Sequence, residues 1–499
     1  MATPRTEVTP GPVDRPASLE SFGYQQELRR ELSFVDLLAY GLVFMVPIAP
    51  FAIFGQVFNV SGGMVALTYV VAMVAMLLTA NSYAQMVRAF PMAGSVYNYA
   101  GRGIHPTVGF LAGWSILLDY VLVPSLLYVV AAFSMNVVAS AIPVWLWLVV
   151  FVVVNTVINY LGIRITARTT MLFLVAELIV LALVLIFFVV GLAQGKGNGI
   201  GGATALFNGD TFGWSLIFGA VAVAMLSFLG FDGISMLAEE NREEARQIGR
   251  AMAGALLVAG ALFVSQTWLA SMLVPNPEKV INEGYVGDEF AAAAEAASGH
   301  WLYVLTSVAT ALAWGIANAM VAQGATSRLL FAMARDRQLP AFLARVSPRR
   351  SVPVNAVLLV ALVSLALGLT LWFWRDVQSI TDLATLVNFG AMVAFLTLHV
   401  TVVWHFVART RSSDYLRHLV LPVLGFAILL FVVINQNIFA KALGGIWILI
   451  GLVILAVLIA MKRTPLLSGL SEEDATTPKG DPDPTIDPGP IPPQRGDRP

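Results

Sequence analysis

The sequence contains no cysteine and few charged residues. Of its 499 residues, 12% are Asp, Glu, Lys or Arg and none is Cys, whereas soluble globular proteins carry about 25% charged residues. The lack of cysteine excludes disulfides, iron–sulfur sites and a thiol nucleophile. The net charge of −1 provides no basic bias of the kind that nucleic-acid binding requires.

The sequence is instead rich in long apolar runs. Hydrophobic residues make up 58% of the chain, and the mean hydropathy is +0.79. Many runs reach about 20 residues, the length at which a helix crosses about 30 Å of hydrocarbon. A β-barrel is disfavoured, because its strands alternate over about ten residues. We predict an all-α integral membrane protein with twelve spans, near 33–58, 63–88, 107–138, 143–161, 168–193, 212–236, 248–274, 299–325, 354–373, 380–407, 417–435 and 443–462.

The two ends of the chain differ from the apolar runs between them. Residues 1–31 are polar and lack the apolar core of a signal peptide. The end of the chain is rich in Pro, Asp and Gly, a composition typical of disorder. We therefore expect an N-terminal tail over 1–31, a transmembrane domain over 32–463 and a disordered C-terminal tail over 464–499.

Basic residues predict the orientation in the membrane. If the N-terminus is placed inside, the inner loops hold sixteen arginines, and the outer loops hold only Lys196, Lys279, Arg375 and Lys441. The positive-inside rule then predicts that both termini are cytoplasmic, and the even number of spans agrees. We expect the protein in the cell (plasma) membrane as a multi-pass protein.

Three acidic residues, Asp119, Glu177 and Asp232, lie well inside predicted spans. A buried acid costs a few kcal/mol at the bilayer centre, so each needs a role. One role is on a substrate or proton path, and the other is a structural hydrogen bond between helices. No basic residue follows Glu177 within ten positions. Desolvation therefore favours its protonated form, which suits a proton-coupling group.

Two spans contain residues that interrupt a helix. The first span reads "AYGLVFMVPIAPFAIFG", where Pro47 and Pro50 lack amide hydrogens. The sixth reads "SFLGFDGISMLAEE", where Gly230 and Gly233 flank Asp232 and ease the departure from helical geometry. Breaks at matching positions of two halves indicate inverted repeats with a binding site at the midplane. Spans 1–5 and 6–10 would form the repeats, and the freed backbone groups become candidate ligands.

These features accompany a family resemblance. The chain resembles the amino acid–polyamine–organocation (APC) permeases over roughly residues 30–463. The matching pieces are "FPMAGSVYNYAGRGIHPTVGFLAGWSILLDYVLVP", "SFLGFDGISMLAEE", "EEARQIGRAM", "SRLLFAMARDRQLP" and "VPVNAV". Within the superfamily, "GWSILLDYVLVP", "SFLGFDG" and "LVNFGAMVAF" look most like the putrescine-importer subgroup.

The resemblance implies a fold and a way of working. The fold is the leucine-transporter-type (LeuT-type) 5+5 inverted repeat, with helices 1 and 6 broken and with alternating access. The permease domain over 32–463 would contain repeat one at about 33–193, repeat two at about 212–407 and extra helices at about 417–462. The family carries out no covalent chemistry, so we expect no enzyme activity, no cofactor and no metal.

The resemblance also implies a substrate site. In family members the substrate lies between the unwound parts of spans 1 and 6, and spans 3, 8 and 10 complete the pocket. Carried over to this sequence, the site comprises Val46, Pro47, Ile48 and Ala49; Ser227, Phe228, Leu229 and Asp232; Asp119 or Tyr120; Trp314 or Asn318; and Asn388. Phe228 and Phe231 are candidates for a gate, with plain packing as the alternative. Glu177 and Asp232 are candidates for proton coupling.

The sequence departs from the family pattern at two places. Amino acid permeases usually have a glycine–serine-rich break in span 1 whose amides hold the substrate carboxylate, whereas this chain has "MVPIAPF". Two prolines leave fewer donors, which favours an amine without a carboxylate. Glu177 lies near the position where some members place a lysine that stands in for sodium. An acid there favours a proton or the ammonium of the substrate, and sodium is the less favoured alternative because oxygen ligands are few in the spans.

These observations predict a secondary active transporter that imports a small cationic nitrogen compound, such as putrescine or another amine, by proton symport. The alternative is an amino acid permease, either a proton symporter or an exchanger. Too few polar residues are present for the continuous water path of a channel. Arg328, Arg335, Asp336 and Arg337 follow span 8 and are either a cytoplasmic gate network or simple topology determinants. The oligomeric state stays open, and the expected partners are the bilayer, the substrate and protons.

Overall fold

The computed structural model describes residues 32–92, 94–242, 244–284, 287–336, 338–347, 352–374 and 377–461. Both predicted tails and Arg337 lie outside these residues. The regular secondary structure of the described chain is helical, and its one β contact is an isolated bridge between Leu32 and Asn241. The all-α prediction is confirmed.

The described residues contain twelve candidate membrane spans. Eleven are each long and apolar enough to cross a membrane, and the twelfth is a pair of helices bent by 55° that meets this criterion together. Five spans comprise several helical segments, which are named together below. The spans are α1 (Phe34–Met45) with α2 (Pro50–Val60), α3 (Val65–Ala89), α5 (Pro106–Val138), α6 (Val144–Leu161), α7 (Ile163–Ala193), α9 (Trp214–Ala224) with η2 (Met225–Phe228) and η3 (Phe231–Glu240), α10 (Ala245–Ser271), α13 (His300–Leu312) with η4 (Ala313–Asn318) and α14 (Ala319–Arg335), α15 (Val354–Trp374), α16 (Val377–Val402) with η6 (Val403–Arg409), η7 (Leu416–Val420) with α17 (Leu421–Asn435), and α18 (Ile438–Ala460).

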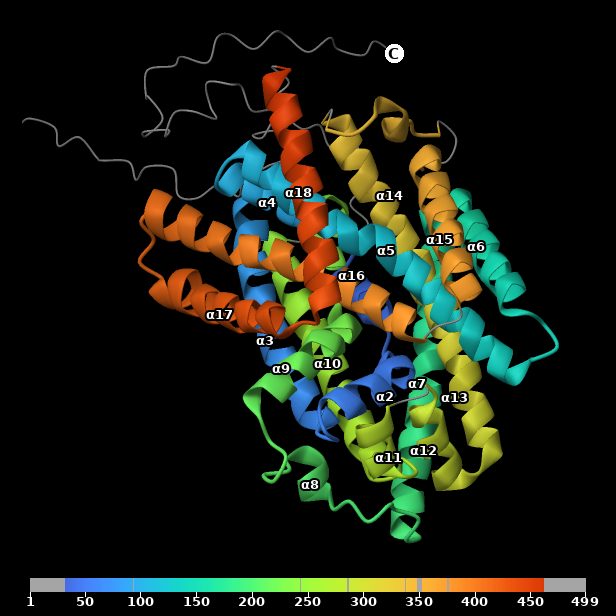
Figure 1. Cartoon of the computed structure of the whole chain (residues 1–499). Coiled ribbons are helices and arrows are strands. Elements are labelled where there is room, and N and C mark those ends of the chain that lie inside the picture. The colour runs from blue at the N-terminus through green and yellow to red at the C-terminus, as the bar shows by residue number, and fades with distance from the viewer. Residues whose placement is uncertain are drawn as a thin grey trace, which may run out of the picture.

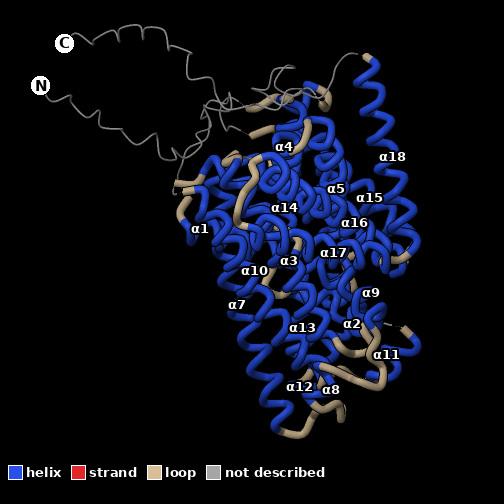
Figure 2. The backbone as a smooth tube through the Cα atoms, turned by 90° about the vertical axis from the view of Figure 1, so that its left-hand side faces the viewer, coloured by secondary structure: helices blue, strands red, loops and turns tan. Residues whose placement is uncertain are grey.

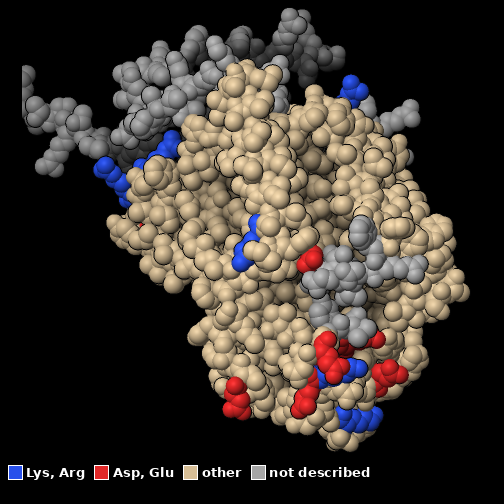
Figure 3. Space-filling model, viewed as in Figure 1, with Lys and Arg blue, Asp and Glu red and all other residues tan. Residues whose placement is uncertain are grey.

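Short helices cover the two ends of the molecule. They are α4 (Ser95–Gly103), α8 (Gly202–Leu206), α11 (Pro277–Glu283), α12 (Glu289–Ser298) and η5 (Ala341–Ala344). Figures 1 and 2 show α4 at one end and α8, α11 and α12 at the other. Acidic side chains gather at the end with α11 and α12 (Figure 3), where that segment carries Glu278, Glu283, Asp288 and Glu295.

The first span breaks as predicted. A reciprocal capping box between Ser33 and Asp36 starts α1, which ends at Met45. Pro50 starts α2, where its missing amide hydrogen costs nothing. Between the two helices Val46 has φ 57°, a conformation that is strained for a β-branched residue. The surrounding structure must therefore hold this break in place.

The sixth span breaks opposite the first. After α9 the chain continues as the 3₁₀ turn η2, and Gly230 then has φ 107°. A Cβ on Gly230 or Gly233 would lie 2.6 Å from the ring of Phe44. These two glycines therefore allow α1 to approach the break, and Gly230 also supplies the left-handed conformation.

The eighth span contains a helical distortion that the sequence does not predict. Residues Ala313–Asn318 form a π-helical segment, η4, between α13 and α14. A π segment leaves one carbonyl without its usual helical partner. Asn155 of α6 donates its side-chain amide to the carbonyl of Gly315 at 2.7 Å. A side chain of a second helix therefore pairs a carbonyl of the π segment, as a water-free interior requires.

The last span is attached to the centre of the molecule by two tryptophans. Trp114 of α5 and Trp447 of α18 each donate an indole N–H to the backbone carbonyl of the other at 2.8 Å. Their rings stack with centroids 4.5 Å apart, and Gly451 leaves room for the ring of Trp114. Most of the remaining surface of α18 is apolar and exposed, as expected of a lipid-facing helix.

Gly390 provides a test of the packing of α16 on α5. A Cβ there would lie 2.7 Å from the carbonyl oxygen of Ser115 and 3.1 Å from the amide nitrogen of Asp119. Since backbone cannot move aside as a side chain can, we expect Gly390→Ala to lower the free energy of unfolding by about 1–3 kcal/mol. Thermal unfolding of the detergent-purified protein measures this change.

The matched control is Gly445→Ala in α18, because a Cβ at Gly445 meets no atom within 4 Å. This control should leave stability unchanged or raise it by up to about 1 kcal/mol, since alanine favours a helix over glycine. Equal losses in the two variants would contradict the packing argument.

Candidate functional site

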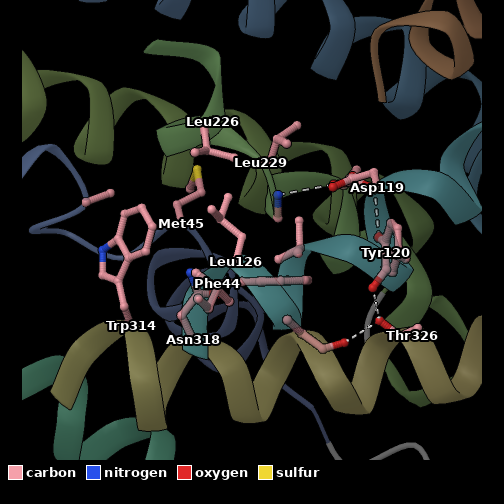
Figure 4. A pocket seen from close by; sticks show the side chains of 16 residues that line it. Phe44, Met45, Asp119, Tyr120, Leu126, Leu226, Leu229, Trp314, Asn318 and Thr326 are labelled. Atoms are coloured by element: carbon pink, nitrogen blue, oxygen red, sulfur yellow. Dashed lines mark hydrogen bonds between the residues drawn. The ribbon is translucent and has the colours of Figure 1, made fainter. Parts of the chain in front are cut away.

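One cavity lies where the two breaks meet. Its volume is about 30 Å³, room for about two water molecules, because one water needs at least about 10–15 Å³. A small organic substrate therefore needs side chains to move before it fits. The lining residues are Phe44, Met45, Ala49, Asp119, Tyr120, Val123, Leu126, Leu127, Leu226, Leu229, Gly230, Asp232, Trp314, Asn318, Ala322 and Thr326 (Figure 4).

The cavity brings together seven of the thirteen predicted substrate residues. These are Ala49, Asp119, Tyr120, Leu229, Asp232, Trp314 and Asn318. The other nine lining residues were not predicted, although helical spacing contains a signal for part of them. Val123 follows Asp119 at i+4, and Ala322 and Thr326 follow Asn318 at i+4 and i+8, positions that share one face of a helix.

One end of the cavity is acidic. The Tyr120 hydroxyl donates to Asp232 Oδ2 at 2.8 Å, and the Gly230 amide donates to Asp232 Oδ1 at 3.3 Å. Asp119 lies in the same lining, is 4% exposed, and its Oδ1 has no hydrogen-bond partner among the described residues. Two buried carboxyl groups therefore share this end, and Asp119 has an acceptor available for a ligand.

The position of Tyr120 is itself fixed by a neighbouring span. Thr326 of α14 donates its hydroxyl to the backbone carbonyl of Tyr120 at 2.6 Å. This bond joins the third and eighth spans beside the carboxyl groups. The acidic end is therefore assembled from α5, η3 and α14, which are far apart in the sequence.

The other end of the cavity is neutral. Figure 4 shows Trp314 and Asn318 away from Asp119 and Tyr120, with the apolar side chains of Met45, Leu126 and Leu229 between. The indole Nε1 of Trp314 and the amide Oδ1 of Asn318 are buried and make no hydrogen bond within the described chain. Both belong to η4, so the π distortion presents two unpaired polar groups to the cavity.

The backbone at the breaks has few amide hydrogens to offer a ligand. Pro47 and Pro50 have none. Several remaining amides donate to carbonyls of the breaks themselves. These bonds run from Val46 to Val43, from Ala49 to Val46, from Phe51 to Ile48, from Leu229 to Leu226 and from Gly233 to Gly230. The prediction of a donor-poor break in span 1 agrees with this geometry.

Six predicted substrate residues do not line the cavity: Val46, Pro47, Ile48, Ser227, Phe228 and Asn388. Other spans engage three of them. Gln266 donates to the carbonyl of Pro47 at 3.0 Å, Tyr69 and Ser227 share a hydrogen bond of 2.9 Å, and Asn388 donates to the carbonyl of Ala222 at 2.8 Å. The bonds to Pro47 and Ser227 hold the two breaks, and the bond from Asn388 joins α16 to α9.

Phe228 and Phe231 are fully buried in aromatic clusters. Phe228 packs against Tyr69 and Phe263, with ring centroids 6.1 and 5.0 Å away. Phe231 packs against Tyr83 and Phe395, with both centroids at 5.7 Å. Neither ring lines the cavity, so in this conformation both serve packing.

Glu177 lies apart from the cavity. It is 4% exposed on α7, and neither carboxyl oxygen has a hydrogen-bond partner in the described part of the chain. Helix α7 packs against α1, α10 and η4. An unpaired buried carboxyl group is costly, and no hydrogen bond within the described chain accounts for the burial of Glu177.

Contacts join the spans at the end that carries α4. Arg328 of α14 and Glu240 of η3 approach to 3.7 Å, and the Tyr97 hydroxyl of α4 donates to Asp336 at 2.7 Å. The amide of Leu32, before α1, donates to the carbonyl of Glu240 at 3.1 Å. Arg328 and Asp336 therefore connect separate segments at this end.

Comparison with known proteins agrees with this architecture. The sequence profile of the family described as "Amino acid permease" matches residues 33–462. The low-affinity putrescine importer PlaP of Escherichia coli (strain K12) is 32% identical over 447 residues, which cover 88% of this chain and 96% of that protein. The branched-chain amino acid permease BcaP of Bacillus subtilis (strain 168) is 26% identical over 459 residues, covering 86% and 93%.

A vacuolar relative from a plant is also similar. Cationic amino acid transporter 4 of Arabidopsis thaliana is 28% identical over 404 residues, covering 75% of this chain and 63% of that protein. The resemblance drawn from the sequence is confirmed, and with it a multi-pass membrane protein that is not an enzyme. The chain belongs to the amino acid permease family of the APC superfamily, whose members transport small molecules across membranes.

Proposed function

We propose that this permease imports a small cationic amine, such as putrescine, by proton symport with alternating access. The observation that carries this proposal is the imbalance of polar groups around the cavity. Two buried carboxyl groups, Asp119 and Asp232, face it, while the amides of the breaks are largely engaged elsewhere. A desolvated ammonium group needs such acceptors, and a carboxylate needs donors. The similarity to a putrescine importer supports the same substrate class.

The two ends of the cavity suit the two ends of a diamine. One ammonium group would lie beside Asp119 and Asp232, and the alkyl chain would lie along Met45, Leu126 and Leu229. The second ammonium group would meet the unpaired Oδ1 of Asn318 and the ring face of Trp314. Cation–π attraction to a desolvated indole is worth about 2 kcal/mol.

An amino acid is the second candidate substrate. Two relatives of this chain are branched-chain amino acid permeases, and the unpaired indole N–H of Trp314 is one donor for a carboxylate. In that orientation the α-ammonium group would still bind at the acidic end. The amine is favoured because the side-chain N–H groups of Trp314 and Asn318 would have to replace the several backbone amides that a carboxylate needs.

Uptake by the purified protein tests the substrate class. In proteoliposomes with an imposed pH gradient we expect uptake of labelled putrescine and little uptake of leucine or arginine. Asp232→Asn should reduce putrescine uptake by more than about a hundredfold, because one ammonium group loses its buried partner. The control is Asp382→Asn, an acid at the start of α16 that accepts from Asn437 outside the cavity. Amino acid uptake without amine uptake would refute the proposal.

Glu177 and Asp232 are the proposed proton carriers. The carboxyl group of Glu177, which no hydrogen bond within the described chain holds in its charged form, can take up and release a proton as its exposure changes. We expect Glu177→Gln to abolish the increase in uptake that the pH gradient causes. Exchange of labelled for unlabelled putrescine without a gradient should persist, because glutamine has nearly the same size and shape as glutamate at position 177. Unchanged stimulation by the gradient would show that Glu177 carries no proton.

The orientation with both termini cytoplasmic is also a proposal, and the lack of native cysteine makes it testable. Asp210→Cys and Ser413→Cys each place one thiol at an exposed position, in the loop after α8 and in the loop after η6 respectively. A membrane-impermeant maleimide should label the first in intact cells and the second only after permeabilisation. The reverse pattern would invert the orientation.

A further inference from the structure

The second and seventh spans, α3 and α10, form a closely packed pair. Glycines of α10 provide the contact: a Cβ on Gly249 would meet Ala84 of α3, and one on Gly260 would meet Met73. The two helices occupy equivalent places in the two halves of the five-plus-five arrangement. Each sends one buried polar side chain to a broken span.

Gln266 of α10 reaches the break of the first span. Its side chain is fully buried, and Nε2 donates to the carbonyl of Pro47 at 3.0 Å and to the carbonyl of Leu262 at 2.9 Å. The break leaves the Pro47 carbonyl outside a regular helix, next to the strained Val46. Without the amide of Gln266 this carbonyl would be buried and unpaired.

Tyr69 of α3 reaches the break of the sixth span. Its side chain is also fully buried, and its hydroxyl shares a hydrogen bond of 2.9 Å with the hydroxyl of Ser227 in η2. The ring packs against Phe228 and Phe263. Ser227 lies two residues before Leu229 and five before Asp232, both of which line the cavity.

The two bonds are arranged crosswise. A helix of the second half supports the break of the first half, and a helix of the first half supports the break of the second. Neither Tyr69 nor Gln266 lines the cavity. In a membrane interior no water replaces a lost partner, so each bond decides where a non-helical segment lies.

We propose that Tyr69 and Gln266 are positioning residues that fix the two broken segments in register across the cavity and thereby set substrate affinity without touching the substrate. Leaving a buried group unpaired shifts an equilibrium by about five- to a hundredfold. Their loss should therefore weaken binding through displacement of residues 44–49 and 226–232. The proposal holds whichever class of substrate the site takes.

The matched variants remove the polar group that reaches each break and keep the volume of the side chain. They are Gln266→Met and Tyr69→Phe, with Tyr128→Phe as the control. Tyr128 is equally buried, and its hydroxyl donates to Gln323 Oε1 at 3.3 Å. Neither residue belongs to a break. Where Tyr69→Phe does not fold, Ser227→Ala removes the same bond from its other side. Gln266→Asn, which shortens the side chain, is the second choice for the other bond.

Hydrogen–deuterium exchange of the full chain in detergent is the first measurement. We expect Gln266→Met to raise exchange about tenfold in the peptide covering 44–52, and Tyr69→Phe to do so in the peptide covering 224–234. Tyr128→Phe should change neither peptide. Unchanged exchange in both peptides, or a rise across the whole chain, would overturn the proposal, because the first denies positioning and the second indicates general destabilisation.

Transport of labelled putrescine is the second measurement. Each variant should raise KM about tenfold and change the maximal rate, per folded protein, less than twofold. Tyr69→Phe combined with Ser227→Ala should be no worse than either alone, because both remove one bond, whereas Tyr69→Phe with Gln266→Met should be additive. An unchanged KM would overturn the proposal. If the wild type does not transport putrescine, the proposed substrate fails, and the exchange measurement still decides the roles of Tyr69 and Gln266.

Discussion

The interior of a bilayer contains no water to satisfy a backbone group that leaves a helix, and this constraint organises the molecule. The first and sixth spans both leave helical geometry in the middle of the membrane, beside each other. The structure satisfies them in three ways. Short turns pair amides within the break, Asp232 accepts from Gly230, and side chains from α3 and α10 pair Ser227 and Pro47. The same rule explains the amide of Asn155 beside η4.

The way in which these backbone groups are satisfied decides whether mainly donors or mainly acceptors are left for a ligand. Two prolines remove amide hydrogens from the first break, and turns consume several of the rest. The polar groups left for a ligand are mainly acceptors: the Asp119 and Asp232 carboxyl groups and the Oδ1 of Asn318. This excess of acceptors is the reason for proposing a cation as the ligand. The relatives of this chain include an importer of an amine and permeases of amino acids, so members of one family handle both classes.

Alternating access needs segments that move together and segments that do not. The close pair of α3 and α10 is hydrogen-bonded to both breaks, which ties four spans into one body. The bond from Thr326 to Tyr120 ties the eighth span to the third on the opposite wall of the cavity. The proposed substrate site lies between these two groups of spans. A relative movement of the groups would change the cavity without breaking either set of bonds.

The sequence alone determined the helical class, the twelve spans and the positions of both breaks, because hydrophobic length, proline and glycine act locally along the chain. It also identified Asp119, Asp232, Trp314 and Asn318, since the family motif and their unusual polarity single them out. Only the tertiary structure decided that Phe44 and Met45, rather than Val46 to Ile48, face the cavity, because the turn of a broken chain depends on what packs behind it. The π segment and the proposed roles of Tyr69 and Gln266 could not be predicted from the sequence either. Each depends on a partner more than 150 residues away in the chain, and no local pattern records such a pairing.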